Sequence, residues 1–267
     1  MSIYRKFEQW DFMRCADIEI VRARMGPCGL GKHFHDKWSI GLILQGVCQF
    51  NSGNQHYQVT ESGLFIIPPY EVHECAAASS SVAYQVMYIA DALLATAAPS
   101  LHRFFSGNSV RVEELPVRLT QLLLHIAEKQ DDNLLLNDCF RQLDLFFYHS
   151  DASVIPKSSH SLQDALHLVW SEAVDLKKIT EATKYSRWHA IHTFSQQIGL
   201  SPRLYLRQLR VLKARHMLQE GRPLAEVAND LHFADQAHFC RTFKSVFGVS
   251  PGKLQRVMLG KSPSENL

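Results

Sequence analysis

The segment ADQAHFCRTFKSVFGVSP at residues 234–251 decides the fold, because a related segment, YSRWHAIHTFSQQIGLSP, stands 49 positions earlier at residues 185–202. Six of the 18 aligned positions are identical, and they include the closing Gly-x-Ser-Pro. Internal similarity of this kind is typical of an architecture that uses one supersecondary unit more than once. The C-terminal part of the chain is therefore predicted to contain two copies of one unit.

Each copy predicts a short helix, a tight turn and a second helix. Ser186 and Asp235 are suitable N-caps for the second helices, because Ser and Asp side chains accept hydrogen bonds from the free amides of a first turn. Gly199 and Gly248 are suitable C-terminal residues, because glycine commonly ends helices. Ser-Pro then restarts a helix, with Pro at its first position. The two helix-turn-helix units are expected at about 176–198 and 224–247.

Residues 203–220 separate the units and contain no helix breaker before Gly221 and Pro223. A rigid helix there, rising about 1.5 Å per residue, would hold the units at a fixed separation. Two such units about one DNA turn apart could read successive major grooves on one face of a duplex. The alternative is a helical array with no role in nucleic-acid binding.

The charge of the chain is divided unevenly. The net charge of +2 combines a balance of −4 in residues 1–159, with 13 Lys+Arg against 17 Asp+Glu, and +6 in residues 160–267, with 15 against 9. A basic half joined to an acidic half favours an anionic partner for the basic half alone. Two ordinary solvated surfaces are the alternative interpretation.

Residues 160–258 closely resemble the DNA-binding domain of AraC/XylS-type transcription regulators. The similarity lies in the second unit from Leu231 to Pro251, in the matching positions of the first unit, and in Ala225-Glu226-Val227-Ala228. It implies a cytoplasmic, sequence-specific transcription regulator whose partners are double-stranded DNA, a small-molecule effector, RNA polymerase and a second copy of the chain. It implies no membrane association and no enzymatic activity.

Outward residues near the start of each second helix are expected to contact DNA. These are Arg187, Trp188, Ile191 and His192 in the first unit, and Gln236, Ala237, His238, Cys240, Arg241 and Lys244 in the second. Gln236 suits adenine, Arg241 suits guanine, and Lys244 suits a phosphate. The alternative role for His238 is to stabilise the fold instead of contacting DNA. His232 replaces the glycine that is usual in the family at the turn.

The first ninety residues predict a small β-barrel or sandwich. Apolar, partly alternating segments separated by turn residues occur at 18–25, 40–50, 57–60, 63–67 and 82–89. Helical periodicity follows at 115–148, broken at 131–133, and predicts a helical hairpin that packs on its own domain or forms a dimer seam. We expect an α+β two-domain protein with a barrel at 1–100, the hairpin at 101–150, a linker at 151–161 and an all-α DNA-binding domain at 162–260.

His33-Phe34-His35 with Gly46, and Gly63 with Pro68-Pro69 and His73, resemble the two short motifs of the cupin β-barrel. The resemblance implies a sensor domain in which His33, His35 and His73 could hold Zn²⁺ or another divalent ion. Ser39 or Ile40 occupies the place of the family's glutamate, which disfavours a cupin enzyme. The histidines could instead be remnants of a metal site that no longer binds metal, or could form hydrogen bonds to an organic effector. Aromatic residues line an effector pocket or fill the barrel: Trp38, Phe50, Phe65 and Tyr84.

Six scattered cysteines, at 15, 28, 48, 75, 139 and 240, indicate reduced thiols. Cys28, Cys48 and Cys75 lie near the histidines in sequence and allow thiol sensing, with buried inert cysteines as the alternative. No segment has the roughly 20 apolar residues that cross a bilayer. Residues 26–33 nearly match a P-loop, but His33 stands where Ser or Thr would hold Mg²⁺, so we do not expect nucleotide binding there.

Overall fold

The computed structural model describes residues 7–15, 18–27, 29–105, 111–114, 117–126, 132–148, 161–170 and 186–260. The chain forms two compact units. One contains residues 1–29 and 34–158, and the other contains residues 30–33 and 159–267. Among the described residues, no helix is both long and apolar enough to cross a membrane.

The N-terminal part is β-rich, as the cupin-like prediction requires. Its strands are β1 (Phe7–Cys15), β2 (Ile18–Met25), β3 (Leu30–His33), β4 (Trp38–Gln45), β5 (Cys48–Ser52), β6 (Gln55–Val59), β7 (Gly63–Ile67), β8 (His73–Ala77), β9 (Val82–Ile89) and β10 (Arg111–Glu114). They form a six-stranded sheet in the order β1-β2-β9-β4-β7-β10 and a four-stranded sheet in the order β3-β8-β5-β6. The ladders of β2 with β9 and of β4 with β7 are antiparallel.

Three predicted strands have the predicted bounds, at 18–25, 63–67 and 82–89. The apolar run 40–50 contains parts of two strands, because the chain turns at Gly46 with φ +84°. A Cβ at Gly46 would lie 2.5 Å from the Ser81 carbonyl oxygen, so only glycine fits this turn. Strands β1, β3, β8 and β10 were not predicted. The end of the P-loop-like motif, Gly31-Lys32-His33, also lies in strand β3, where a P-loop has a helix.

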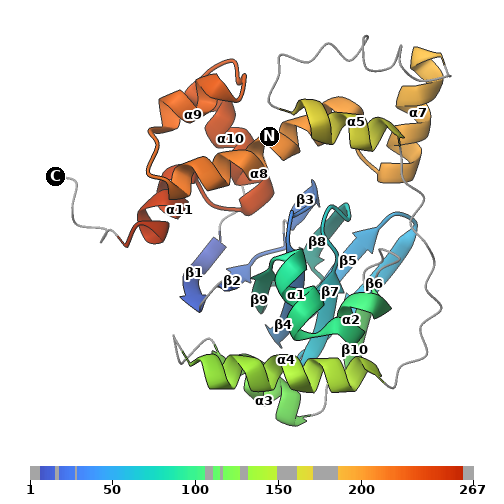
Figure 1. Ribbon diagram of the computed structural model, residues 1–267, viewed down its shortest axis with the longest axis vertical. Helices are drawn as coiled ribbons and strands as arrows, with labels where there is room; N and C mark the ends of the chain where they lie inside the picture. Colours follow the sequence, from blue (N-terminus) through green and yellow to red (C-terminus); the bar gives the residue numbers. More distant parts are fainter. Residues whose placement is uncertain are drawn as a thin grey trace. The chain divides into compact units, whose positions relative to one another are not determined.

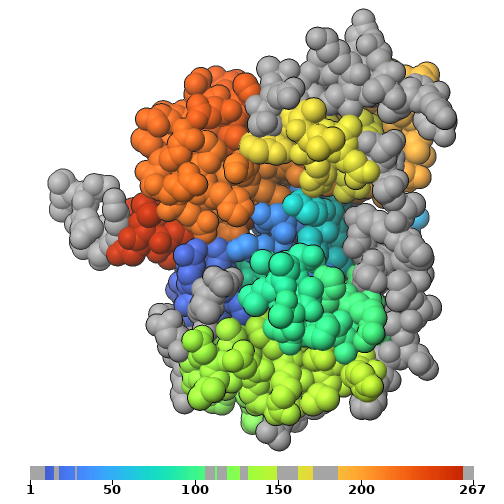
Figure 2. All heavy atoms as spheres, in the orientation of Figure 1, coloured from blue at the N-terminus to red at the C-terminus, as the bar shows by residue number. Residues whose placement is uncertain are grey.

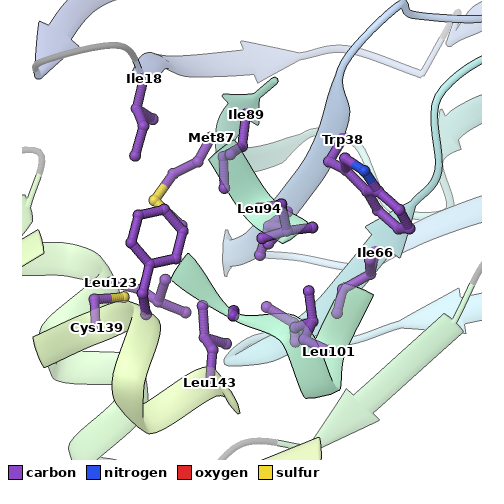
Figure 3. Close-up of a cluster of buried hydrophobic side chains, with 14 of the residues drawn as sticks. Ile18, Trp38, Ile66, Met87, Ile89, Leu94, Leu101, Leu123, Cys139 and Leu143 are labelled. Carbon is purple, nitrogen blue, oxygen red and sulfur yellow. The ribbon is translucent and has the colours of Figure 1, made fainter. Parts of the chain in front are cut away.

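Four helices cover one face of the six-stranded sheet. They are α1 (Asp91–Ala97), α2 (Pro99–Phe104), α3 (Val117–Ile126) and α4 (Asn133–Tyr148), and the last two lie in the stretch that predicted a hairpin. Figure 1 shows α3 and α4 side by side, and Figure 2 shows their surface adjoining that of α1 and α2. Strand and helix side chains share one apolar core, drawn in Figure 3. The helices are therefore part of the same hydrophobic core as the sheet.

The C-terminal part of the chain is helical, as predicted. Its described helices are α5 (Ser161–Val169), α7 (Arg187–Ile198), α8 (Pro202–Gln219), α9 (Leu224–Asp230), α10 (Gln236–Phe247) and α11 (Pro251–Met258). Helix α8 is the predicted rod, and its 18 residues span about 27 Å. Helices α5 and α7 pack on it, as do α9, α10 and α11 (Figure 1). The predicted linker up to residue 160 and the first helix of the first unit, in 171–185, lie outside the described residues.

Candidate functional sites

The second predicted recognition helix is α10. Asp235 caps it, with Oδ1 accepting from the His238 backbone N–H at 2.6 Å, and Gly248 ends it in the left-handed conformation at φ +73°. Phe239 and Phe243 are fully buried and attach the helix to its unit. Gln236, Ala237 and Arg241 lie on the exposed side, as their predicted role requires. The helix therefore presents a polar, accessible surface at its N-terminal half.

Three predicted contact residues of α10 are half-buried. His238 packs its ring against Phe233, with centroids 5.5 Å apart, and its Nδ1 is buried with no hydrogen-bond partner among the described residues. This packing supports the alternative role of His238, in which the Nδ1 side of its ring stabilises the fold instead of contacting DNA. Cys240 and Lys244 are also partly covered, and burial raises the pKa of Cys240 despite the neighbouring Arg241 charge.

The turn before α10 has the backbone conformation that glycine favours. His232 has φ +57°, and its N–H donates to the Asn229 carbonyl at 3.0 Å. The next amide, that of Phe233, donates to the Ala228 carbonyl at 2.9 Å. The turn therefore keeps its hydrogen bonds although a histidine stands at the position where the family usually has glycine.

The first predicted recognition helix, α7, repeats this construction. The Ser186 hydroxyl accepts from the His189 backbone N–H at 3.3 Å, and Gly199 ends the helix at φ +82°. Trp188 is 71% exposed and stacks on His192, with centroids 4.9 Å apart and planes 9° apart. Arg187 is exposed as well, whereas Ile191 is half-buried. The outer face of α7 thus carries a stacked pair of rings, whereas the exposed residues of α10 named above are not aromatic.

Helix α8 is joined to α5 by a buried polar cluster. Tyr205 is fully buried, and its hydroxyl accepts from Gln163 Nε2 at 2.8 Å and lies 2.9 Å from His167 Nε2. Arg210 donates from Nε to the carbonyl of Trp170, just beyond the end of α5, at 3.0 Å. A buried hydroxyl with satisfied hydrogen bonds costs little, so these contacts fix α5 on the rod.

The three predicted imidazoles meet. His33, His35 and His73 are all buried, and each offers one ring nitrogen that lies within 4.8 Å of the other two. Nδ1 of His33 bonds the Gly31 carbonyl at 2.7 Å, and Nδ1 of His73 bonds the Glu71 carbonyl at 2.9 Å. Backbone bonds of this kind fix the tautomer and leave Nε2 as the coordinating atom.

The electrostatic environment of this cluster suits neutral imidazole. Burial lowers the pKa of His73 to about 4, although its bond to Glu71 opposes the shift. Ser39, one of the two candidates with Ile40 for the place of the cupin glutamate, is 2% exposed, and its hydroxyl has no hydrogen-bond partner among the described residues. It lies directly opposite Tyr88 on β9, and the Tyr88 ring packs edge-on against His35 at 5.1 Å. His73 is therefore held as a neutral nitrogen ligand, and none of the three residues of the cluster is a carboxylate.

Sequence reasoning missed a charged pair near this cluster. Glu19 is 1% exposed and opposite Tyr88, and its carboxylate accepts from Lys37 Nζ at 3.0 Å and faces Arg14 at 3.5 Å. A buried carboxylate needs such partners. The available signal was an acidic residue between the apolar residues Ile18 and Ile20 of a predicted strand.

The predicted aromatic lining divides between two faces of the sheet. Phe50 and Phe65 are in contact, with centroids 4.5 Å apart, and the Phe65 ring covers the bare backbone of Gly41. Tyr84 is half-buried, and desolvation of its hydroxyl, with Cys75, Tyr88 and Cys48 nearby, raises its pKa well above the ordinary value. Trp38 instead belongs to the cluster on the helix-facing side (Figure 3), where its Nε1 donates to Asp91 at 2.8 Å. Alternation along β4 separates Trp38 from the barrel lining.

The thiols near the histidines differ in accessibility. Cys48 is buried, and burial, with a smaller contribution from Cys75, raises its pKa far above the ordinary value. A thiol that stays protonated is a poor nucleophile, which disfavours Cys48 as a redox sensor. Cys75 is half-buried, and Cys28 lies outside the described residues.

Two family models match this chain. The AraC-like ligand binding domain matches residues 19–143, and a helix-turn-helix domain matches residues 179–257. The chain belongs to the AraC/XylS family of transcriptional regulators. It is accordingly a DNA-binding regulator with an N-terminal, cupin-like ligand-binding domain.

Relatives of this AraC/XylS-type regulator align with most of its length. YbfI of Bacillus subtilis, an HTH-type transcriptional regulator, is 25% identical over 77% of this chain and 80% of its own length. The activator RhaS of Escherichia coli is 22% identical, covering 92% of this chain and 95% of RhaS. ToxT of Vibrio cholerae with a bound unsaturated fatty acid aligns with a TM-score of 0.62 and 14% identity, over 97% of this chain and all of that one. The ToxT likeness shows the two-domain fold.

Proposed function

We propose that this regulator binds its operator through the exposed sides of α7 and α10, held on α8. The observation that carries the proposal is the pair of matching helices, each capped by a side chain at its start and by a left-handed glycine at its end. Arg187, Trp188, Ile191 and His192 contact DNA in the first unit. Gln236, Ala237, Cys240 and Arg241 contact bases in the second, with His238 and Lys244 beside them.

Footprinting on the DNA upstream of the protein's own gene tests this proposal. We expect protection of two adjacent major-groove segments on one face of the duplex, and an affinity that falls steeply with salt concentration. Binding that is equal on scrambled DNA, or that shows no salt dependence, would contradict sequence-specific recognition.

We propose that the effector of the ligand-binding domain occupies the barrel interior, lined by Phe50, Phe65 and Tyr84. Phe50 on β5 and Phe65 on β7 are buried, Tyr84 on β9 is half-buried, and Ser39 and the three histidines supply polar groups in the same domain. An apolar lining with a few convergent polar groups is typical of small-molecule sites. The protein would act as a cytoplasmic regulator, without catalysis, and would contact RNA polymerase at its promoter.

We propose that α4 joins two copies of the chain. Three large apolar side chains lie exposed along this helix: Leu134, at 82%, Leu145, at 47%, and Tyr148, at 64%. Exposed apolar side chains that line up on one helix favour a protein partner. Because two identical recognition modules read a two-fold related operator, a second copy is the partner that suits a DNA-binding regulator.

A metal-responsive regulator is the second candidate, and the convergence of three buried imidazoles supports it. His33, His35 and His73 would supply neutral nitrogen ligands of the kind that Zn²⁺ takes, and the backbone bonds of two of them fit the usual orientation of metal-binding histidines. A bound ion would hold the three segments together and could ligate an effector.

Elemental analysis of protein purified without a chelating tag tests the metal. We expect one equivalent of Zn²⁺, and its loss in His73→Ala, with His56→Ala as the control because His56 lies on β6 and bonds Asn51. Metal-free protein that also takes up no Zn²⁺ in calorimetric titration would remove this candidate and leave the DNA-binding function in place.

A further inference from the structure

Two side chains of the sheet bind the C-terminal turn of α3. Arg22 on β2 lies directly opposite Gln85 on β9, and Arg22 Nε donates to Gln85 Oε1 at 2.7 Å. The other donors of this Arg22–Gln85 pair reach the helix. Arg22 Nη2 donates to the Leu124 carbonyl at 3.0 Å, and Gln85 Nε2 donates to the Leu123 carbonyl at 2.5 Å.

The pair compensates two local costs. The last carbonyls of a helix have no intrahelical donor and carry the negative end of its dipole, so a guanidinium there is favourable. Gln85 is 2% exposed, and a buried amide is costly unless both its ends are bonded. Here its oxygen accepts from Arg22 and its nitrogen donates to α3. The pair is therefore attached firmly to both the sheet and the helix.

The same two strands also line the barrel. Ile20 and Met87 adjoin the pair on the helix-facing side and belong to the core shared with α3 and α4. Because side chains alternate along a strand, Tyr84 and Val86 project from the other side of β9. Both neighbours of Gln85 in sequence thus face the barrel interior, where the effector is proposed to lie. A ligand that shifts the backbone of β9 would move Gln85 with it.

We propose that the Arg22–Gln85 pair couples occupancy of the barrel to the position of the α3–α4 hairpin. Helices α3 and α4 share one core through Leu123 and Phe140, so a movement of α3 reaches the exposed face of α4. The inference rests on the proposed ligand-responsive barrel and adds the residues through which its state is transmitted. Arg22 and Gln85 act as positioning residues, because they contact the helix backbone and not the ligand.

Hydrogen–deuterium exchange of the full-length protein tests the attachment. We expect Gln85→Leu and Arg22→Met each to raise exchange at the end of α3 about tenfold, as the loss of a buried hydrogen bond implies. Arg24→Met is the matched control. Arg24 lies on the same face of β2, but it donates to Gln45 at 2.8 Å and to Ser81 at 3.3 Å instead of to a helix. If Gln85→Leu does not fold, Arg22→Met carries the test alone.

A second variant tests the coupling without a known effector. Val86→Ala removes two methyl groups from the barrel side of β9 and should raise exchange in α3 in the wild-type background. In the Gln85→Leu background, Val86→Ala should raise the exchange rate of α3 by less than a further twofold. An equal effect of Val86→Ala in both backgrounds, or unchanged α3 exchange in Gln85→Leu and Arg22→Met, would overturn the proposal. Footprinting of the same variants separates this result from a failure of the DNA-binding proposal, because operator binding is measured independently.

Discussion

Single residues carry the chemistry of the DNA recognition proposed for this regulator. Arg241 lies exposed on α10 at a position where a guanidinium could bond the O6 and N7 atoms of guanine. Trp188 and His192 stack into one flat surface on α7, which suits apolar contact with a base edge or a sugar. The two recognition helices therefore differ in the kind of contact they offer, although their backbones are built alike.

Replacement of Arg241 by Ala should lower operator affinity by about 1–3 kcal/mol and relax the preference at one base pair. The loss follows from removing a bidentate pair with guanine. Gel-shift titration against operators with each base at that position measures both effects. Arg256→Ala is the control, because Arg256 lies on α11 and donates to its own helix at the Gly252 carbonyl. Equal affinities for Arg241→Ala and wild type would remove Arg241 from the base-reading set.

His232 has a conformation that costs a non-glycine residue about 1 kcal/mol. His232→Gly should therefore raise the free energy of unfolding by up to about 1 kcal/mol. The larger conformational entropy of glycine in the unfolded chain reduces this gain. Denaturant titration gives the difference. Gly248 has a similar left-handed backbone conformation, with φ +73°, so Gly248→Ala should lower the free energy of unfolding of the protein by a similar amount. Lower stability of His232→Gly would show that the imidazole has stabilising contacts that outweigh the backbone strain.

The elements are attached by a few polar contacts between apolar faces. Helix α1 begins with Asp91, whose carboxylate accepts from Trp38 on β4 and lies 2.9 Å from His102 on α2. Helix α2 is fixed in turn by α4, because Asp144 Oδ1 accepts from the amides of Ser100 and Leu101 at 2.6 and 3.3 Å. These contacts orient short helices that would be marginal alone.

The attachment of α1 should depend on pH. Burial raises the pKa of Asp91, but the bonds from Trp38 and His102 and the charge of His102 outweigh it and hold the pKa below its ordinary value. Stability from a carboxyl with a lowered pKa is present above its unfolded value and is lost as pH falls through the folded one. Asp91 is mostly exposed, so the effect should be under about 1 kcal/mol.

Unfolding free energies at pH 6 and pH 3 measure this contribution. The wild type should lose more stability between the two than Asp91→Asn, which keeps the shape but not the titration. Parallel losses in both proteins would mean that Asp91 does not titrate differently in the folded state.

The whole molecule combines a ligand-binding unit with a DNA-binding unit, each with its own core. The apolar side chains exposed on α4 belong to the first unit, and the recognition helices belong to the second. The proposed dimer surface and the proposed DNA-reading helices therefore lie on different parts of the chain, so a variant in one part can be measured without damage to the other.

Leu145→Lys should weaken the dimer at least tenfold, because a charge at a buried apolar interface must be desolvated. Sedimentation or light scattering over a range of concentrations gives the dissociation constant. Leu168→Lys is the matched control, since Leu168 is 81% exposed on α5 of the other unit. A mass independent of concentration and equal in wild type and Leu145→Lys would contradict the α4 interface.

The sequence by itself determined the elements that local chemistry specifies. The caps at Ser186 and Asp235, the glycines that end α7 and α10, and the rod α8 follow from short-range hydrogen bonding and backbone sterics. Three strands of the barrel were predicted from apolar, partly alternating segments between turn residues, and the His33, His35 and His73 set was predicted from a motif. Short or irregular strands such as β3 and β8 carry too little periodicity to be predicted.

Only the tertiary structure decided which residues share a face. Both Trp38 and Phe65 were predicted to line the effector pocket. The pleat of the strands instead places Trp38 on the face of the sheet that the helices cover, and it places Phe65 over Gly41. The bonds of Arg22 and Gln85 to α3 span 102 and 38 residues, and nothing local in the sequence signals them. Contacts between distant segments depend on register and packing, which the whole chain sets together, whereas caps and turns depend only on their near neighbours.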